Sequence, residues 1–288
     1  MRRFELVEPT SLGEACALLA EREDRRAIAG GTALLVLIKL GLYVPTVLVN
    51  LKKVQGASDV EVTPDGGLRV GALASVYDVE TAAAVRERYP LLAQACHVVA
   101  NIRIRNLATI GGNVAHGDYQ SDPPTALLAL DAAVELTDGR RTRQVALADF
   151  LLGPYETALA PGELVAAVRV PPLAPDFHGT YLKFTTRSSE DRPCAGVAAL
   201  VRTEAGRCAD VRLAVGAVSP VPLRVRRAEE LARGECLTPT LIEAMAAEAA
   251  RAVEPLEDLR GPADYKRQVV GVLARRALVA CAAKGATT

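Results

Sequence analysis

Residues 108–130 read ATIGGNVAHGDYQSDPPTALLAL, a run that joins a paired glycine and several polar residues to an apolar segment. Glycine accepts positive φ angles and lets the backbone approach a ligand closely. Asp122 followed by Pro123 is typical of a helix that begins with an aspartate N-cap and a proline in its first turn. The stretch therefore predicts a glycine turn, a polar connection and a buried helix.

The stretch has a counterpart in residues 27–41, AIAGGTALLVLIKLG. Both segments read as a short apolar strand, a Gly-Gly pair, a small polar residue (Thr32 or Asn113) and a helix. Free N–H groups in such a turn form an anion-binding nest, and the following helix adds the positive end of its dipole. Two matched turns are suited to the two phosphates of a dinucleotide, although a Gly-Gly pair is also an ordinary turn. Neither G-x-G-x-x-G nor G-x-x-x-x-G-K-[ST] occurs, so a Rossmann fold is not expected.

The composition excludes several classes of function. Half of the 288 residues are apolar, which is enough for a packed core in one elaborate domain or two. The 34 basic and 34 acidic residues balance, no long block of like charge occurs, and tryptophan is absent, so nucleic acid is not an expected partner. No apolar run approaches the roughly 20 residues of a membrane span, and the N-terminus does not resemble a signal peptide. We expect a cytoplasmic protein without a transmembrane segment.

The first part of the chain is expected to alternate strands and helices. Ser11, with Glu14 three residues later, predicts a capped helix, and Gly41 is expected to close the helix after the first glycine pair. Turn signals in PDGG and in Asp138-Gly139 predict two hairpins. One helix is expected over residues 75–89 and another from Pro90.

A domain boundary is expected at residues 171–178, PPLAPDFH, which are rich in proline and lack periodicity. Three antiparallel strands should follow, with helices last, which is the order of an α+β domain. The expected domains are residues 1–173, with a division near residue 56 into two α/β subdomains, and residues 178–288.

Other polar residues give weaker signals. His116, Asp118 and Asp122 match no metal-ligand spacing, and a lysine on a predicted strand, such as Lys183, is usually an exposed edge or face residue. The six cysteines include no C-x-x-C pair, so we expect buried, reduced thiols and no metal site. No catalytic triad or acid–base pair is readable.

With both glycine segments in view, the chain resembles the medium, flavin-carrying subunit of molybdenum hydroxylases, a family that includes the medium subunit of aerobic carbon monoxide dehydrogenase and the FAD-binding subunit or domain of xanthine dehydrogenase. The similarity extends in order to IRIRNLATIGGN, LLGPYETALAPGELVAAVRVP, YLKFTTRSSED, GAVSPVPLRVRRAEE and DLRGPADYKRQVVGVLARRAL, and so covers nearly the whole chain. It implies an α+β protein: a PCMH-type (vanillyl-alcohol-oxidase-like) FAD-binding domain followed by a C-terminal α+β domain of the CO-dehydrogenase-flavoprotein type.

The resemblance also implies which residues bind FAD, while it implies no catalytic residue. Both glycine turns would bind the pyrophosphate of FAD. The second turn, shaped by Gly111, would also reach toward the flavin. Asp122 and Lys183 fall on family positions at the cofactor, and Leu159 falls on a leucine packed on the isoalloxazine. The implied cofactor-binding set is Ala29, Gly30, Gly31, Thr32, Ala33, Leu34, Thr109, Gly111, Gly112, Asn113, Asp122, Leu159 and Lys183.

Two positions depart from the family pattern. Ala33 stands where many members have Asp or Ser, which removes a polar contact but keeps the backbone nest. Arg192 or a neighbour stands where the family pattern would place a different residue near the flavin ring. A cation there would stabilise a reduced, anionic flavin and raise its potential; an Arg192→Ala variant with unchanged potential would contradict this hypothesis.

The resemblance implies an electron-transfer oxidoreductase subunit with FAD in this chain. Molybdopterin and 2Fe–2S clusters are expected only in partners, namely a molybdopterin-binding large subunit and an iron–sulfur small subunit, assembled as a dimer of heterotrimers. Electrons would pass from the iron–sulfur clusters through FAD to an external acceptor. One alternative is a stand-alone FAD-dependent oxidoreductase of the same fold, for which no substrate-side base is seen. Another is a nucleotide-binding module without redox function.

Overall fold

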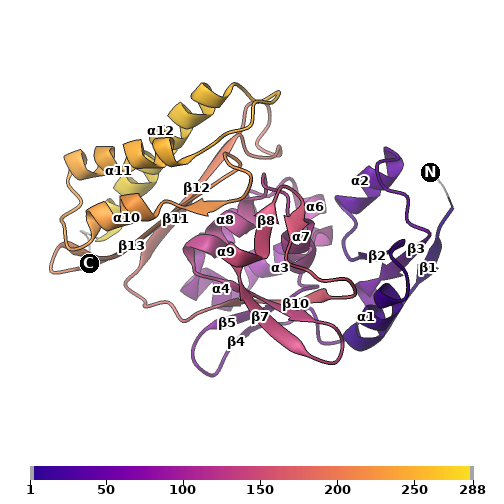
Figure 1. The fold of residues 1–288 in the computed structure, drawn as a ribbon. Coiled ribbons are helices and arrows are strands. Elements are labelled where there is room, and N and C mark those ends of the chain that lie inside the picture. Colours follow the sequence, from indigo (N-terminus) through magenta and orange to yellow (C-terminus); the bar gives the residue numbers. More distant parts are fainter. Residues whose placement is uncertain (1–2, 286–288) are drawn as a thin grey trace.

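A computed structural model describes residues 3–285, so the first two and last three residues of the expected domains lie outside the described range. Three parts follow one another along the chain, with the N-terminal lobe at the right of Figure 1 and the C-terminal helices at the upper left. Within the described residues, no helix is both long and apolar enough to cross a membrane.

The N-terminal lobe is a small parallel sheet with strand order β1–β3–β2. Val49 and Cys16 are buried between this sheet and α1. Ser11 caps α1 as expected: its Oγ accepts a hydrogen bond from Glu14 N at 3.2 Å. The elements of this lobe are β1 (Glu5–Val7), α1 (Leu12–Ala20), β2 (Arg25–Ile28), α2 (Leu34–Lys39), β3 (Val47–Asn50) and the 3₁₀ turn η1 (Leu51–Lys53).

The central part combines an antiparallel sheet of order β4–β5–β10–β6–β7 with a group of short helices. Both expected hairpins are present, as β4–β5 and β6–β7. The elements are β4 (Val60–Val62), β5 (Leu68–Gly71), α3 (Val76–Thr81), α4 (Ala83–Arg88), α5 (Pro90–His97), α6 (Ile102–Leu107), α7 (Ile110–His116), α8 (Asp122–Ala129), β6 (Ala133–Thr137), β7 (Thr142–Ala146), α9 (Leu147–Phe150), β8 (Leu151–Gly153), β9 (Glu156–Thr157) and β10 (Leu164–Val170).

The single helix expected over residues 75–89 is wrong, because Ala82 is extended (ψ 128°) and separates α3 from α4. Just before the break, the Thr81 hydroxyl donates to the Tyr77 carbonyl at 2.8 Å. A threonine bonded back to the preceding turn weakens and bends a helix. The run of alanines favoured a continuous helix, and it did not reveal that the Thr81 hydroxyl competes for the hydrogen bonds of the preceding turn.

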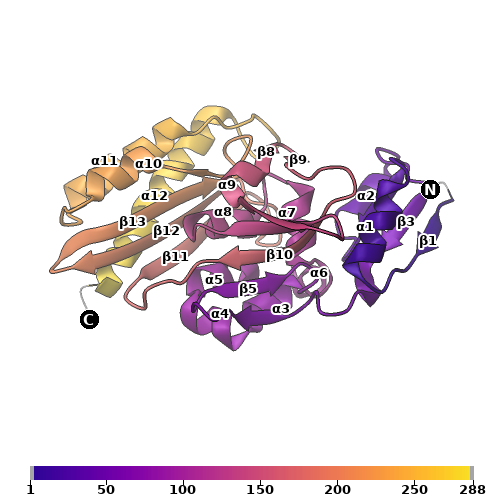
Figure 2. The same ribbon diagram turned by 60° about the horizontal axis from the view of Figure 1, so that its bottom comes forward.

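The C-terminal part has the expected order of antiparallel strands followed by helices. Its sheet, ordered β11–β12–β13–β14, has α10, α11 and α12 against one face (Figure 2). The elements are β11 (His178–Phe184), β12 (Ala195–Glu204), β13 (Arg207–Gly216), β14 (Leu223–Arg224), α10 (Arg226–Ala232), α11 (Pro239–Ala252) and α12 (Ala263–Gly285).

The same sheet has its other face on the central part. Along β12, Val197 and Ala199 face the core formed with α10–α12, whereas Ala198 and Leu200 join the central core. Burial on both faces explains why β12 is apolar for seven residues in succession. The two parts therefore share one continuous apolar interior.

The cysteines are mostly as expected. Five of the six are buried and carry free thiols, and only Cys236 is exposed. Burial raises the pKa of the Cys16 and Cys208 thiols to about 11, so these two are poor nucleophiles near neutral pH. The expectation of buried thiols was wrong for Cys236, which lies in the connection between α10 and α11.

Candidate functional site

The first glycine pair forms the turn between β2 and α2, as expected. Gly31 has a φ of 69°, a conformation that favours glycine. Ala33 precedes α2 and gives it no side-chain cap. Across residues 3–285, the backbone N–H groups of residues 30–33 find no protein acceptor, and all four residues are half-buried. Four adjacent free donors in a partly enclosed turn are suited to an anion.

Gly30 brings the two glycine segments together. A β-carbon at residue 30 would lie 1.9 Å from the Leu107 carbonyl oxygen and 2.9 Å from Ala108 Cα. Thr109, the N-cap of α7, comes next in the chain. Segments separated by almost eighty residues thus meet through direct backbone contact, and this contact requires a residue without a side chain.

The second glycine pair is not a strand–turn–helix unit, and that expectation is wrong. Helix α6 precedes it instead of a strand, and Gly111 and Gly112 lie inside the first turn of α7. A β-carbon on Gly111 would stand 2.4 Å from Ala72 Cβ. Glycine is a poor helix former, but this close packing of α7 against Ala72 outweighs the local preference.

The backbone donors at the start of α7 are already used. Ile110 N and Gly111 N donate to Ala74 O and Ala72 O at 3.0 and 2.9 Å, while Gly112 N donates to Thr109 Oγ1 at 3.1 Å. Asn113 N donates to Thr109 O at 2.9 Å. The second segment therefore cannot act as a second backbone nest. It offers the side chains of Thr109 and Asn113 and the bare face of Gly112.

Ser121, at the end of the connection between α7 and α8, orients the Asn113 side chain. Ser121 Oγ donates to Asn113 Oδ1 at 2.8 Å, which leaves the Asn113 amide nitrogen as a donor. Ser121 is the N-cap of α8, so the expected N-cap role of Asp122 is wrong: Asp122 is the first residue of the helix. The Asp122 side chain points into the protein, where it meets buried side chains of β11.

Asp122 joins the central part to the C-terminal sheet. Tyr181 donates its hydroxyl to Asp122 Oδ1 at 2.8 Å, and Lys183 Nζ lies 3.0 Å from Oδ2. The side chains of Asp122 and Lys183 are only 5% and 6% exposed, so the expectation of a surface lysine is wrong. Lys183 also donates to Val98 O at 2.8 Å. Burial raises the pKa of Asp122 to about 6, although Lys183 and Tyr181 both act to lower it.

Leu159 lies in the loop that follows β9 and is half-buried against the central core. Strand β9 approaches the end of α7, where a β-carbon on Gly117 would meet Thr157 at 3.2 Å. Leu159 follows β9 by two residues, and β9 lies near the end of α7 rather than its beginning.

At that end of α7, Asp118 and Arg192 form an ion pair with Nε 2.9 Å from Oδ2. The His116 ring lies 5.1 Å from the Tyr155 ring. Burial lowers the pKa of His116, with Asp118 and Arg192 acting in opposite directions. No local pattern favoured Asp118 as a site residue, because its partner Arg192 is 74 positions away along the chain.

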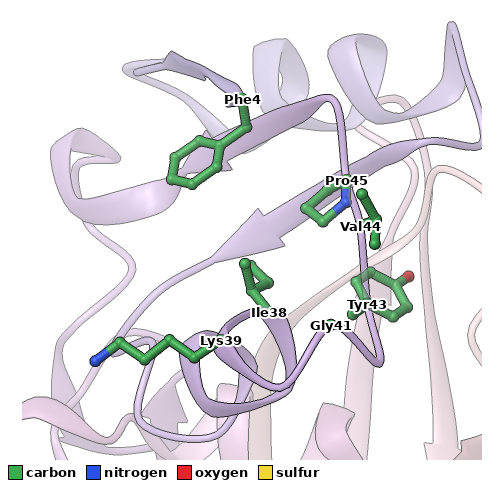
Figure 3. A pocket seen from close by; sticks show the side chains of 7 residues that line it. All are labelled: Phe4, Ile38, Lys39, Gly41, Tyr43, Val44 and Pro45. Atoms are coloured by element: carbon green, nitrogen blue, oxygen red, sulfur yellow. The ribbon is translucent and has the colours of Figure 1, made fainter. Parts of the chain in front are cut away.

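A hollow of about 200 Å³ lies elsewhere, in the N-terminal lobe (Figure 3). Ile38 near the end of α2, and Tyr43 and Pro45 after it, line the hollow, so it lies at the opposite end of α2 from the free N–H groups. Among residues 3–285, no three His, Cys, Asp or Glu side chains are placed to hold a metal ion.

The donors present fit a dinucleotide cofactor. Free backbone N–H groups suit a diphosphate, and the bare face of Gly112 permits close approach. Thr109 and Asn113 add side-chain donors. Helices α2 and α7 have only six and seven residues, so the helix dipole contributes less than these direct hydrogen bonds.

Comparison with known proteins gives two family matches. Residues 2–173 match the family described as the FAD binding domain in molybdopterin dehydrogenase, and residues 180–281 match the CO dehydrogenase flavoprotein C-terminal domain. The chain is 35% identical over 276 residues to the nicotine 6-hydroxylase medium subunit of Paenarthrobacter nicotinovorans, covering 96% of each chain. It is 34% identical over 285 residues to the carbon monoxide dehydrogenase medium chain of Hydrogenophaga pseudoflava, covering 98% of each.

Solved structures give the same result. A structure of carbon monoxide dehydrogenase from Hydrogenophaga pseudoflava has a TM-score of 0.95 at 35% identity, covering 98% of each chain. Quinoline 2-oxidoreductase from Pseudomonas putida 86 has a TM-score of 0.93 at 29% identity, again covering 98% of each chain. These likenesses confirm the α+β fold class expected from the sequence.

Proposed function

The chain belongs to the family of FAD-binding medium subunits of molybdenum hydroxylases, and from this membership we propose that it relays electrons between partner iron–sulfur clusters and an external acceptor. FAD supplies the redox chemistry when bound. The residues of this chain bind the cofactor, orient it and set its electrostatic surroundings. None of them acts as acid or base on the substrate of the complex.

The contact of Gly30 with Leu107 supports the FAD site in this proposal. It brings the turn of residues 30–33 against the segment that leads into α7, the helix that Thr109 caps and that carries Asn113. We assign the diphosphate to the free N–H groups, with Ala29 and Leu34 completing the turn. The second segment contributes the Thr109 hydroxyl, the Asn113 amide and the open face of Gly112. The proposed diphosphate site is thus asymmetric, because one segment supplies backbone donors and the other supplies side-chain donors.

The remaining predicted residues act toward the flavin half of the cofactor. Leu159 lies toward the far end of α7 and would provide an apolar contact for the ring. Asp122 and Lys183 remain predicted contacts, and their ion pair gives them a second role. It fixes α8 against β11, so the two domains hold one geometry around the cofactor.

The proposed partners are an iron–sulfur small subunit and a molybdopterin-binding large subunit, in a dimer of heterotrimers. The names "medium subunit" and "medium chain" of the relatives support companion chains. The stand-alone alternative would require this chain to turn over a substrate by itself.

An absorption spectrum of the purified chain tests the proposal. We expect the visible bands of bound flavin, which decrease when dithionite is added. A chain without those bands after reconstitution with FAD would contradict FAD binding and favour a nucleotide-binding module. Co-expression with candidate iron–sulfur and molybdopterin subunits tests the relay. Substrate turnover by the isolated chain, with no subunit association, would favour the stand-alone enzyme.

A further inference from the structure

One loop of the C-terminal domain contacts the central part at two places. The loop connects β11 to β12, and its Glu190 accepts a hydrogen bond from Asn101 Nδ2 at 3.0 Å. Its Arg192 pairs with Asp118 at 2.9 Å. Asn101 begins α6 and Asp118 follows α7. The loop therefore extends from the start of α6 to the end of α7.

Burial and a backbone hydrogen bond fix the position of the Asp118 carboxylate that binds Arg192. The Asp118 side chain is only 8% exposed, and its Oδ1 accepts a hydrogen bond from Gln120 N at 3.1 Å. Arg192 uses Nε for the ion pair, and half of its side chain (52%) is exposed. The carboxylate is thus enclosed by protein, while the outer edge of the guanidinium faces away from it.

The length of α7 relates this pair to the diphosphate. Seven residues span about 10 Å of helix, and the glycine segments lie at its beginning. The ribityl chain of FAD separates diphosphate from ring by a distance on the order of this length. If FAD lies along α7 with its diphosphate at the glycine segments, its ring would reach the end of the helix where the Arg192–Asp118 ion pair and the His116 and Tyr155 rings lie.

Building on the proposed FAD site, we propose that Arg192 is the cation that faces the flavin ring and that Asp118 is its positioning residue. Oxidised flavin takes up two electrons and one proton to become the anionic reduced form. A guanidinium stays protonated at any physiological pH, and a nearby positive charge favours the form with more negative charge. Arg192 therefore raises the reduction potential of the bound flavin.

The test is a redox titration of the full chain with bound FAD, using dithionite and a mediator dye. Arg192→Gln removes the charge and keeps a hydrogen-bond donor for Asp118. We expect the equilibrium constant for reduction to fall about tenfold, which is about 30 mV for a two-electron couple. Arg192→Lys should stay near wild type. Arg140→Ala, in the exposed β6–β7 hairpin, removes one positive charge elsewhere and should change nothing. A potential in Arg192→Gln equal to that of Arg140→Ala would overturn the proposal.

A double-mutant cycle tests the positioning role. If Asp118 holds Arg192 in place, Arg192→Gln shifts the potential less in an Asp118→Asn background than in wild type. An equal shift in both backgrounds would overturn the role of Asp118. The result also separates this inference from the proposed function, because a wild-type chain without bound flavin contradicts FAD binding itself. Bound flavin with an unchanged potential contradicts only the role of Arg192.

Discussion

Gly30 lies against the backbone of Leu107 so closely that a β-carbon on it would stand 1.9 Å from the Leu107 carbonyl oxygen. The neighbouring atoms are backbone and cannot rotate away. This one contact sets the distance between the free N–H groups after β2 and the start of α7. The cofactor site therefore depends on the small size of residue 30 as much as on its backbone freedom.

Gly30→Ala is predicted to separate the two segments and to abolish retention of FAD during purification. We also expect the free energy of unfolding to fall by about 1–3 kcal/mol, the usual cost of overpacking. Flavin absorbance per chain and urea unfolding measure the two effects. Gly13→Ala, in helix α1, is the matched control, because the atom nearest to its β-carbon, the Gly139 carbonyl oxygen, would lie 3.5 Å away. A Gly30→Ala chain with full flavin content would contradict the assigned site.

Asn113→Ala is predicted to weaken FAD binding about tenfold, which is the loss of one hydrogen bond of about 1.4 kcal/mol to the cofactor. Binding of FAD to the apoprotein, followed by flavin fluorescence, measures this. Asn106→Ala is the control, because Asn106 is exposed and its amide donates only to the Ile102 carbonyl at 2.8 Å. Equal affinities in the two variants would remove Asn113 from the site.

The sequence predicted the two hairpins and the order of strands and helices in the C-terminal part, because turn chemistry and periodicity are local. It did not predict that the second pair lies inside a helix, because the cause is packing of Gly111 against Ala72. It also placed Lys183 on the surface. The partner that buries Lys183 is Asp122, 61 residues earlier, and no local pattern indicates such a pair.

The Asp122–Lys183 pair should show strong coupling. Lys183→Met leaves the buried Asp122 carboxyl without its cation and should cost about 3–5 kcal/mol in the free energy of unfolding at pH 7. Asp122→Asn should cost less, because an amide is neutral like protonated Asp122 and keeps an oxygen that accepts hydrogen bonds. The double variant should cost less than the sum of the two, because no unpaired charge remains. Urea unfolding of the four chains measures the coupling. Strict additivity would show that the two groups act independently.

Stability should also depend on the ionisation of Asp122. Its pKa in the folded chain is about 6, against an ordinary value of 3.8, so the folded chain keeps a proton on Asp122 between about pH 4 and 6 that the unfolded chain has lost. The contribution of this group to the free energy of unfolding therefore decreases as pH rises through that window and is constant above it. The total decrease is about 3 kcal/mol.

Unfolding of wild type and of Asp122→Asn at several pH values from 4 to 7 measures this contribution, because the other titrating groups are the same in both chains. The advantage of wild type over Asp122→Asn should be largest near pH 4 and should shrink toward pH 6. Below pH 4 both states of the wild-type chain carry the proton, so the difference should level off there. A difference that is constant from pH 4 to 7, or that grows with pH, would mean that the ion pair with Lys183 outweighs burial and keeps Asp122 ionised throughout.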